Sequence, residues 1–283
     1  MSDFTTRFAP SPTGLLHRGH AYSALKAFTA AKAAGGRFIL RIEDIDTTRC
    51  RPAFETALLE DLAWLGLTWE QPVRRQSEHM ADYHAALQSL SDRGLAYRCF
   101  RTRKDVAQEM ASAPHGPTSA FRGGPLPLTE ESQSLAEGKP FAWRLSLDAA
   151  RSALGDFASL TFLEEGAGAG GQTGQIQANP DLLGDIILAR KDVGVAYHLA
   201  VTLDDALQGV THIVRGEDLF EATHIQRLLQ ALLSLPTPIY RHHPLLRGAD
   251  GVRLAKRHNS ETLQSLRLAG VKPDTLRKEL GFD

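Results

Sequence analysis

The chain has 283 residues, 42% of them hydrophobic, and a formal net charge of -1. This length and composition suit a globular protein with one or two ordinary cores. The near-zero charge excludes a globally basic nucleic-acid binder, although a local basic groove on a neutral protein can still bind phosphates. No apolar run approaches the ~20 residues of a membrane span, so no contact with a membrane is expected.

The cysteine content and the first residues indicate the compartment. Only two cysteines occur, Cys50 and Cys99, which argues against a disulfide scaffold and favours a reducing environment. The opening run, MSDFTTRFAPSPTG, has neither the regions of a signal peptide nor the composition of a transit peptide. We therefore expect a cytoplasmic protein.

The first 65 residues predict a βαβ unit followed by a second helix. Residues 5–9 are typical of a short strand, and the Ala-, Leu- and Lys-rich segment 20–34 is typical of a helix. The compact apolar run RFILRI at 37–42 suits a buried parallel strand. A further helix is expected over 53–65, with Pro52 in its first turn.

The region from about 77 to 185 has the composition of an insertion. A helix is predicted over 77–93 and a half-buried strand over 141–147, while 112–128 is rich in proline and predicts a loop. The run EEGAGAGGQTG at 164–174 is rich in glycine like a phosphate-binding loop, but it lacks the Gly-Lys-Ser/Thr ending. A flexible insertion is the preferred interpretation.

An α/β pattern returns after the insertion. The segments IILAR, VAYHLAV and THIVR resemble strands, residues 218–233 resemble a helix, and residues 260–280 resemble two short helices. These elements predict an α/β fold in which an inserted segment interrupts an open parallel sheet.

The turn PSPTGLLHRGH lies between the first strand and the first helix, where backbone amides can face an anion. His17 and His20 can share one face of the helix, and Gly14 and Gly19 permit a ligand to approach the backbone closely. Imidazoles beside a helix N-terminus suit the charge that develops when an α-phosphorus is attacked. A Pro/Gly turn with two surface histidines explains the isolated motif equally well.

A second motif is VRLAKRH at residues 252–258, after a glycine-rich stretch. A loop that carries Lys256 and flanking arginines can close over a triphosphate. Taken alone, this motif is more often a solvated basic loop.

A third group combines charged residues at expected strand ends. Glu43 follows a predicted strand, where α/β folds bind ligands, and its carboxylate can receive an ammonium group. Arg7 and Arg215 can bind a carboxylate. Tyr197 belongs to the same group and lies in the strand-like segment VAYHLAV, which precedes THIVR. Ordinary ion pairing at strand ends, worth about 0–1 kcal/mol, is the alternative.

Together these motifs resemble the glutamyl- and glutaminyl-tRNA synthetases, which are class I aminoacyl-tRNA synthetases. The run RFAPSPTGLLHRGH resembles their signature, with residues 17–20 as the HIGH-type element, and RIEDID and THIVRGEDL match further motifs in the same order. RLAKR resembles the KMSKS-type loop. The resemblance spans nearly the whole chain except residues 100–180.

Only 26 residues follow Arg257, whereas a full glutamyl-tRNA synthetase continues into a large helical anticodon-binding domain. The chain therefore resembles the glutamyl-queuosine tRNA(Asp) synthetases, free-standing paralogues of the catalytic core that glutamylate queuosine in the anticodon of tRNA(Asp). The resemblance implies a Rossmann-like catalytic core with an inserted α+β subdomain and a short helical C-terminus. The implied division is 1–76 and 186–247 for the two halves of the catalytic domain, 77–185 for the inserted acceptor subdomain, and 248–283 for the KMSKS-like loop and C-terminal helices.

The resemblance also implies roles for individual residues. The side-chain carboxylate of glutamate would contact Arg7 and Arg215, and its α-amino group would contact Glu43. The full glutamate-binding set is Arg7, Phe8, Ala9, Pro10, Ser11, Glu43, Tyr197 and Arg215. The ATP-binding set is Pro10, Ser11, Thr13, Gly14, His17, Gly19, His20, Arg253, Leu254 and Lys256, of which His17, His20 and Lys256 would act in catalysis.

The implied reaction uses ATP and Mg²⁺. The α-carboxylate of L-glutamate attacks the α-phosphorus, pyrophosphate leaves, and a hydroxyl of the acceptor then attacks the mixed anhydride. No protein nucleophile is needed, because alignment and charge stabilisation provide the rate. The expected partners are L-glutamate and queuosine-containing tRNA(Asp), and the expected state is a monomer.

The sequence departs from the family in two places. Family members often bind zinc through Cys-x-Cys and a later Tyr-x-x-x-Cys, but here Arg101 stands where the cysteine after Cys99 would be. Because structural zinc sites usually need four ligands, we predict no zinc, and His115 does not complete a site. In the KMSKS-type loop, Arg253 replaces the first lysine and Ala255 the first serine.

Two alternatives stay open. The same core can charge the 3′ end of tRNA or another acceptor, and a non-catalytic RNA-binding paralogue can retain the fold. A basic cluster consisting of Arg98, Arg101, Arg103 and Lys104 can contact tRNA phosphates, although such runs are more often solvated faces.

Overall fold

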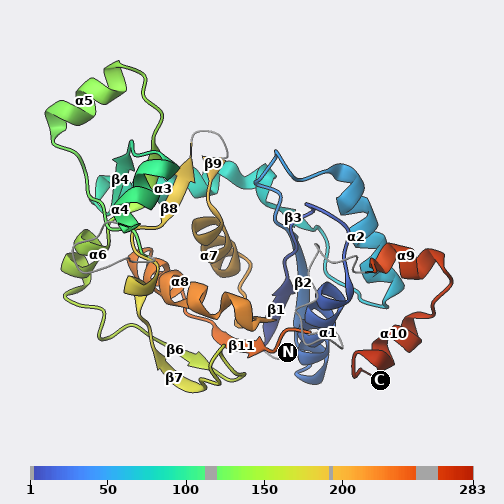
Figure 1. Ribbon diagram of the computed structural model, residues 1–283. Coiled ribbons are helices and arrows are strands. Elements are labelled where there is room, and N and C mark those ends of the chain that lie inside the picture. Colours follow the sequence, from blue (N-terminus) through green and yellow to red (C-terminus); the bar gives the residue numbers. More distant parts are fainter. Residues whose placement is uncertain (1–2, 112–119, 191–193, 247–260, 283) are drawn as a thin grey trace.

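The computed structural model describes residues 3–111, 120–190, 194–246 and 261–282 (Figure 1). It opens with the predicted βαβ unit: strands β1 (Thr5–Phe8) and β2 (Arg37–Ile42) pair in parallel, and helix α1 (Arg18–Ala33) connects them. Helix α2 (Pro52–Trp64) follows and begins at the expected proline. Local sequence therefore predicts this unit well.

The central strands come from distant parts of the chain. Strand β3 (Arg74–Arg75) extends the first sheet beside β2, and β10 (His212–Gly216) lies along β1, where the Thr211 amide donates to the Thr5 carbonyl at 2.9 Å. Strand β11 (Ile239–His243) pairs in parallel with β10. The parallel arrangement confirms the predicted α/β fold class.

A hairpin continues the second of these sheets. Strands β6 (Thr161–Glu164) and β7 (Gly174–Gln177) are antiparallel, and β6 pairs with β11 through the Glu164–Tyr240 bridge. The glycine-rich run at 164–174, interpreted from sequence as a flexible insertion, connects these two strands. Neither strand is among the elements predicted from the sequence.

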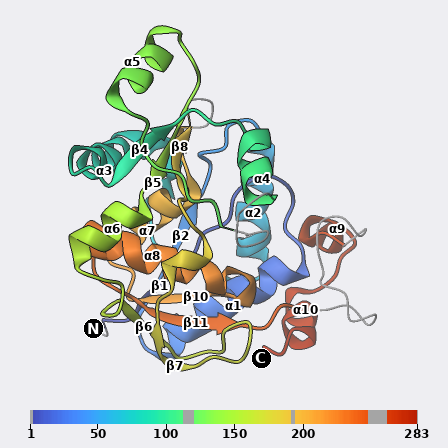
Figure 2. The same ribbon diagram turned by 60° about the vertical axis from the view of Figure 1, so that its left-hand side comes forward.

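A separate antiparallel sheet lies at the other end of the molecule (Figures 1 and 2). Its strands, in order, are β4 (Ala96–Cys99), β5 (Ala142–Leu145), β8 (Ile187–Arg190) and β9 (Gly194–Val195). The helices of this region are α3 (Met80–Asp92), α4 (Arg103–Ala111), α5 (Leu128–Ala136) and α6 (Leu147–Leu154).

The topology changes two expectations. The IILAR strand is β8 and pairs in this antiparallel sheet, although the predicted division assigned it to the second half of the catalytic domain. The hairpin β6–β7 lies within the predicted insertion, yet it joins the sheet of β10 and β11. The four-part division otherwise stays a prediction.

The prediction of a strand over VAYHLAV is wrong. Strand β9 ends at Val195, Ala196 is the extended N-cap residue, and helix α7 (Tyr197–Leu207) begins at the predicted tyrosine. A short apolar run does not distinguish a buried helix from a buried strand, and here Leu199, Ala200 and Val201 are all buried.

The remaining helices complete two hydrophobic cores. Helix α8 (Phe220–Leu232) packs with α7 in one core, and α9 (Leu263–Leu268) and α10 (Pro273–Glu279) pack with α1 and α2 in the other. Among the described residues, 3₁₀ turns lie at Gln76–His79, Pro180–Leu182 and Glu217–Leu219. Within the described ranges, no helix is long and apolar enough to cross a membrane.

Gly184 gives a testable close contact between segments. It has a φ of +65°, and a Cβ there would lie 2.3 Å from the Phe121 carbonyl oxygen. Gly138 has a similar φ of +68° but open space around it. Both alanine variants carry left-handed strain of about 1–2 kcal/mol, and Gly184→Ala adds an overpacking cost of about 1–3 kcal/mol.

We therefore predict that Gly184→Ala lowers the urea midpoint clearly more than Gly138→Ala does. Equal midpoints for the two variants would contradict the contact.

Candidate active site

A cavity of about 320 Å³ lies at the carboxyl ends of β1, β2 and β10, beside the first turn of α1. This is the place where α/β folds bind ligands. Nine of the predicted site residues line it: Arg7, Phe8, Ala9, His17, Gly19, His20, Glu43, Tyr197 and Arg215.

The two histidines of the first motif cap helix α1. His17 is the N-cap residue, and its Nδ1 accepts from the Gly19 amide at 3.1 Å. The Nδ1 of His20 accepts from the His17 amide at 3.2 Å, and the two rings lie 3.8 Å apart. Each histidine thus satisfies an amide that the helix end leaves open, which fixes both rings at the positive end of the helix dipole.

Arg215 lines the cavity and uses two of its three guanidinium nitrogens in hydrogen bonds within the described structure. Its Nε donates to His242 at 3.0 Å, and its Nη2 donates to the Leu219 carbonyl at 3.1 Å and to the Thr223 hydroxyl at 2.7 Å. Its buried Nη1 has no hydrogen-bond partner among the residues that the structure describes. Because a buried unpaired guanidinium donor costs free energy, Nη1 is suited to an anionic ligand group.

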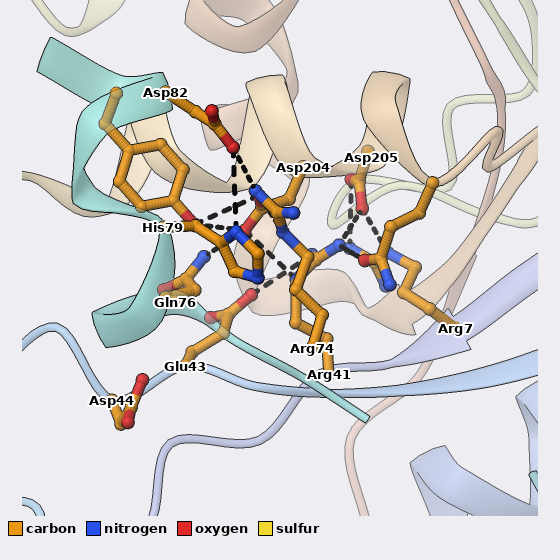
Figure 3. Close-up of polar contacts among 12 residues, drawn as sticks. Arg7, Arg41, Glu43, Asp44, Arg74, Gln76, His79, Asp82, Asp204 and Asp205 are labelled. Carbon is orange, nitrogen blue, oxygen red and sulfur yellow. Dashed lines mark hydrogen bonds and ion pairs between the residues drawn. The ribbon is translucent and has the colours of Figure 1, made fainter. Parts of the chain in front are cut away.

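Arg7 is held differently, by a charged partner. Its Nε donates to Asp205 Oδ1 at 3.0 Å, and its Nη2 is 3.5 Å from Oδ2 of the same carboxylate (Figure 3). The Asp205 carboxylate is on helix α7, so it anchors a strand-end arginine from the neighbouring element.

The fully buried Arg41 on β2 connects this pair to Glu43. Its Nη1 lies 2.9 Å from Asp205 and its Nη2 lies 3.2 Å from Glu43, while its Nε is 3.7 Å from Asp204 (Figure 3). Asp204 also contacts Arg74 at 2.8 Å. A buried carboxylate therefore faces each arginine of the network, as buried charges require.

The network sets the titration of its carboxylates. Burial raises the pKa of Glu43 above its ordinary value, although Arg41 and Arg7 pull it down. Burial alone would also raise the pKa of Asp205, but Arg7 and Arg41 outweigh it and the pKa lies below its ordinary value. Asp205 is thus the carboxylate whose ionised form the network stabilises, whereas a further cation beside Glu43 would stabilise the ionised form of Glu43.

A second cavity, of about 430 Å³, adjoins the first across Glu43 and Tyr197, which line both. Ser11 and Thr13 of the predicted set line this second cavity. Pro10 supports the site through its backbone, because its carbonyl accepts from the Glu43 amide at 3.0 Å. Gly14 lines neither cavity.

Three predicted residues, Arg253, Leu254 and Lys256, lie outside the described residues, as does His115. The cavity also has lining residues that the sequence analysis missed. The Ser23 hydroxyl lies 3.0 Å from His243 Nε2, and Tyr22 and Asp218 line the same cavity. Asp218 lies in the motif THIVRGEDL but was not assigned a role. No motif marks Tyr22, Ser23 or His243, because their proximity depends on how α1 and β11 pack.

Cys99 is the cysteine at which the sequence departs from the zinc-binding pattern of the family. Cys99 is buried and packs with Tyr97 and Phe121. Among the residues with described positions, no group of three histidine, cysteine or acidic side chains can hold a metal ion. The absence of zinc stays a prediction, and so does tRNA contact by the basic cluster, in which Arg98 pairs with Glu131 and Arg101 with Glu109.

The sequence and fold match known proteins. Residues 3–281 match the family of class I tRNA synthetases (E and Q), catalytic domain. A glutamate tRNA ligase from Elizabethkingia meningosepticum, solved in complex with its amino acid, superposes with a TM-score of 0.78 at 25% identity over 98% of this chain and 60% of that chain. A glutamate–tRNA ligase of Aquifex aeolicus is 37% identical over 98% of this chain and 56% of its own length.

Two other relatives match over most of their length. A glutamyl-Q tRNA(Asp) synthetase of Rhodobacter capsulatus is 46% identical, covering 98% of this chain and 99% of that protein. Its counterpart in Symbiobacterium thermophilum is 41% identical, with coverage of 98% and 85%. The fold and the site define the catalytic core of a class I tRNA synthetase, which confirms the prediction of a ligase-type enzyme. Within that class, the chain belongs to the family of glutamyl-Q tRNA(Asp) synthetases.

The buried network gives a stability prediction. Arg41→Met leaves Glu43, Asp204 and Asp205 without their shared cation, which we expect to destabilise the fold by about 3–5 kcal/mol. Arg37, on the same strand, pairs with Glu70 at the exposed surface. Arg37→Met should cost no more than about 1 kcal/mol. Urea denaturation followed by circular dichroism compares the two, and similar midpoints would contradict the role assigned to Arg41.

Proposed function

We propose that the protein activates L-glutamate with ATP as glutamyl-adenylate and transfers it to the queuosine base in the anticodon of tRNA(Asp). The observation that carries the glutamate assignment is that Nη1 of Arg215 has no partner among the described residues and that Glu43 lines the same cavity. The available Nη1 of Arg215 suits a carboxylate, and the carboxylate of Glu43 suits an ammonium group. A ligand that has both groups therefore fits the cavity. The similarity of the chain to a glutamyl-Q tRNA(Asp) synthetase and to a glutamate–tRNA ligase supports this assignment.

In this proposal Arg215 and Arg7 bind the side-chain carboxylate of glutamate, and Glu43 binds its ammonium group. Asp205 already neutralises much of the charge of Arg7, whereas the described partners of Arg215 are neutral. Arg215 is therefore the stronger anion-binding group. Phe8, Ala9 and Tyr197 complete the cavity wall, and Pro10 and Ser11 continue the binding segment.

The ATP site in this proposal is the turn before α1. His17 and His20 face the α-phosphate at the helix N-terminus, with Gly19 beside them, and Pro10, Ser11, Thr13 and Gly14 form the rest of the turn. Lys256, Arg253 and Leu254 contact the triphosphate. Mg²⁺ accompanies ATP and neutralises phosphate charge, as in other phosphoryl chemistry.

The α-carboxylate oxygen of glutamate forms a bond to the α-phosphorus as the bond to pyrophosphate breaks. A hydroxyl of the acceptor then attacks the carbonyl carbon, AMP leaves, and the hydroxyl proton passes to solvent or to the released phosphate. The side chains align the reactants and stabilise charge, and none becomes covalently attached.

The acceptor is the finer part of the proposal. The near-complete coverage of the Rhodobacter relative favours queuosine in tRNA(Asp). Charging of the tRNA 3′ end is the second candidate, because the chain is also similar to glutamate–tRNA ligases. We further propose that the enzyme acts in the cytoplasm as a monomer.

Transfer of labelled glutamate distinguishes the two acceptors. The whole protein is incubated with ATP, Mg²⁺ and tRNA from cells that make or lack queuosine. We expect label only on the queuosine-containing pool. Equal labelling of both pools would mean 3′-end charging, and labelling of neither pool together with absent pyrophosphate exchange would mean a non-catalytic paralogue.

Arg215→Ala tests the glutamate site itself. Hydrogen bonds to charged groups contribute about 1.5–3 kcal/mol, so the KM for glutamate in ATP–pyrophosphate exchange should rise about tenfold to a hundredfold, with little change in the KM for ATP. Arg241 lies on β11 and pairs with Glu165 at the surface, so Arg241→Ala is the control. An unchanged glutamate KM in Arg215→Ala would remove Arg215 from the site.

A further inference from the structure

Arg215 is the last member of a buried chain of hydrogen bonds that reaches the β6–β7 hairpin. Its Nε donates to His242 Nε2 at 3.0 Å. The other ring nitrogen of His242, Nδ1, lies 2.5 Å from Glu164 Oε2, and both of these side chains are fully buried. The three residues come from three adjacent strands, β10, β11 and β6.

The direction of each hydrogen bond follows from chemistry. A guanidinium only donates, so His242 Nε2 must be the acceptor and carry no proton. The proton of the neutral ring is therefore on Nδ1, and this N–H donates a hydrogen bond to the Glu164 carboxylate. The opposite tautomer would direct an N–H at the Nε–H of Arg215, and the two donors would repel each other.

The surroundings of both groups agree with this assignment. Burial lowers the pKa of His242, and Arg215 lowers it further, which outweighs the hydrogen bond with Glu164. Burial would raise the pKa of Glu164, but the hydrogen bonds from the His242 side chain and backbone and from the Gly166 amide hold it below its ordinary value. A neutral imidazole beside an ionised carboxylate is the result.

The glycine-rich run holds Glu164 in this position. A Cβ on Gly166 would lie 2.2 Å from the His242 carbonyl oxygen, so only glycine allows the hairpin to approach β11 this closely. The amides of Glu165 and Ala167 donate to the carbonyls of Tyr240 and His242, at 2.8 and 3.1 Å. Oε1 of Glu164 accepts from the His242 amide at 2.9 Å and from the Gly166 amide at 2.8 Å.

We propose that Glu164 and His242 are positioning residues: Glu164 selects the His242 tautomer that accepts from Arg215, and this aims the open Nη1 of Arg215 at the substrate carboxylate. The inference rests on the proposed function, because it assigns Arg215 the glutamate carboxylate. It gives the glycine-rich run, which is not a phosphate-binding loop, a part in substrate recognition. Neither Glu164 nor His242 lines the cavity, so both act through Arg215.

Glu164→Gln is the most direct test. Glutamine has nearly the same shape, but one oxygen becomes an amide that donates. Its remaining oxygen cannot accept from both the backbone amides and the His242 ring, so the ring loses its tautomer preference and Arg215 loses its acceptor. We expect the glutamate KM in pyrophosphate exchange to rise at least about tenfold, as for other buried donors that lose a partner, while the ATP KM stays within twofold of wild type.

The matched control is Glu165→Gln. Glu165 is the next residue along the chain, and its carboxylate pairs with the partly exposed Arg241. The glutamate KM of the Glu165→Gln variant should stay within about twofold of wild type, as expected for a surface pair. If Glu164→Gln and Glu165→Gln both leave the glutamate KM at the wild-type value, the positioning role is wrong.

Two substitutions at His242 test whether Glu164 acts on Arg215 through this residue. His242→Gln offers a carbonyl oxygen to Arg215 without a tautomer to select, whereas His242→Leu offers no acceptor. We expect the glutamine variant to keep a glutamate KM much closer to wild type than the leucine variant. This pair of variants also tests the positioning role if Glu164→Gln does not fold. Equal glutamate KM values for the two His242 variants would overturn the proposal.

Failure of the proposed function gives a different result. If the wild-type protein shows no glutamate-dependent exchange, the substrate assignment is wrong and the positioning role with it. If the wild-type protein is active and Glu164→Gln retains the wild-type glutamate KM, only the positioning role is wrong.

Discussion

The candidate active site depends on one buried cation, Arg41. Its guanidinium lies between Glu43 and two consecutive carboxylates of helix α7, Asp204 and Asp205, and is fully buried. These contacts join strand β2 to α7, and Asp205 extends the connection to Arg7 on β1. Because removing one partner would leave an uncompensated buried charge, strands and helix are fixed relative to each other at the point where the cavity opens.

The two arginines of the cavity show how the same side chain can be prepared for different tasks. Asp205 is bonded to Arg7, so much of the positive charge of Arg7 is already matched. Arg215 is bonded to an imidazole, a carbonyl and a hydroxyl, all neutral, so its charge remains for a ligand. Orientation without neutralisation is what an anion site requires, since the protein fixes the donor and the ligand supplies the charge.

The sequence predicts features that arise from local interactions. The βαβ unit, helix α2 and the C-terminal helices follow from periodicity, proline and glycine, and the structure has them within a few residues of the expected bounds. The ordered motifs also identified Arg7, Glu43, Tyr197 and Arg215, which line one cavity. The structure adds what makes this possible, namely that β1, β2 and β10 end at the same edge.

Long-range contacts could not be predicted in this way. In the sequence, Asp204 and Asp205 are two acidic residues that no motif marks, and only the packing of α7 against β2 makes them partners of Arg41. Glu164 lies in a segment that composition assigns to a loop, and its role depends on long-range contacts between this segment and β11. The segment VAYHLAV was assigned to a strand because a buried helix and a buried strand have the same apolar composition.

The central claim is that this cavity selects glutamate for activation. The most direct measurement is ATP–pyrophosphate exchange by the whole protein with glutamate, glutamine or aspartate as the only amino acid, each with and without tRNA. We expect exchange with glutamate and at most a trace with the other two, because glutamine lacks the charge that Arg215 Nη1 requires and the side chain of aspartate is one methylene shorter than that of glutamate. Exchange with glutamine as fast as with glutamate, or no exchange with any of the three, would contradict it.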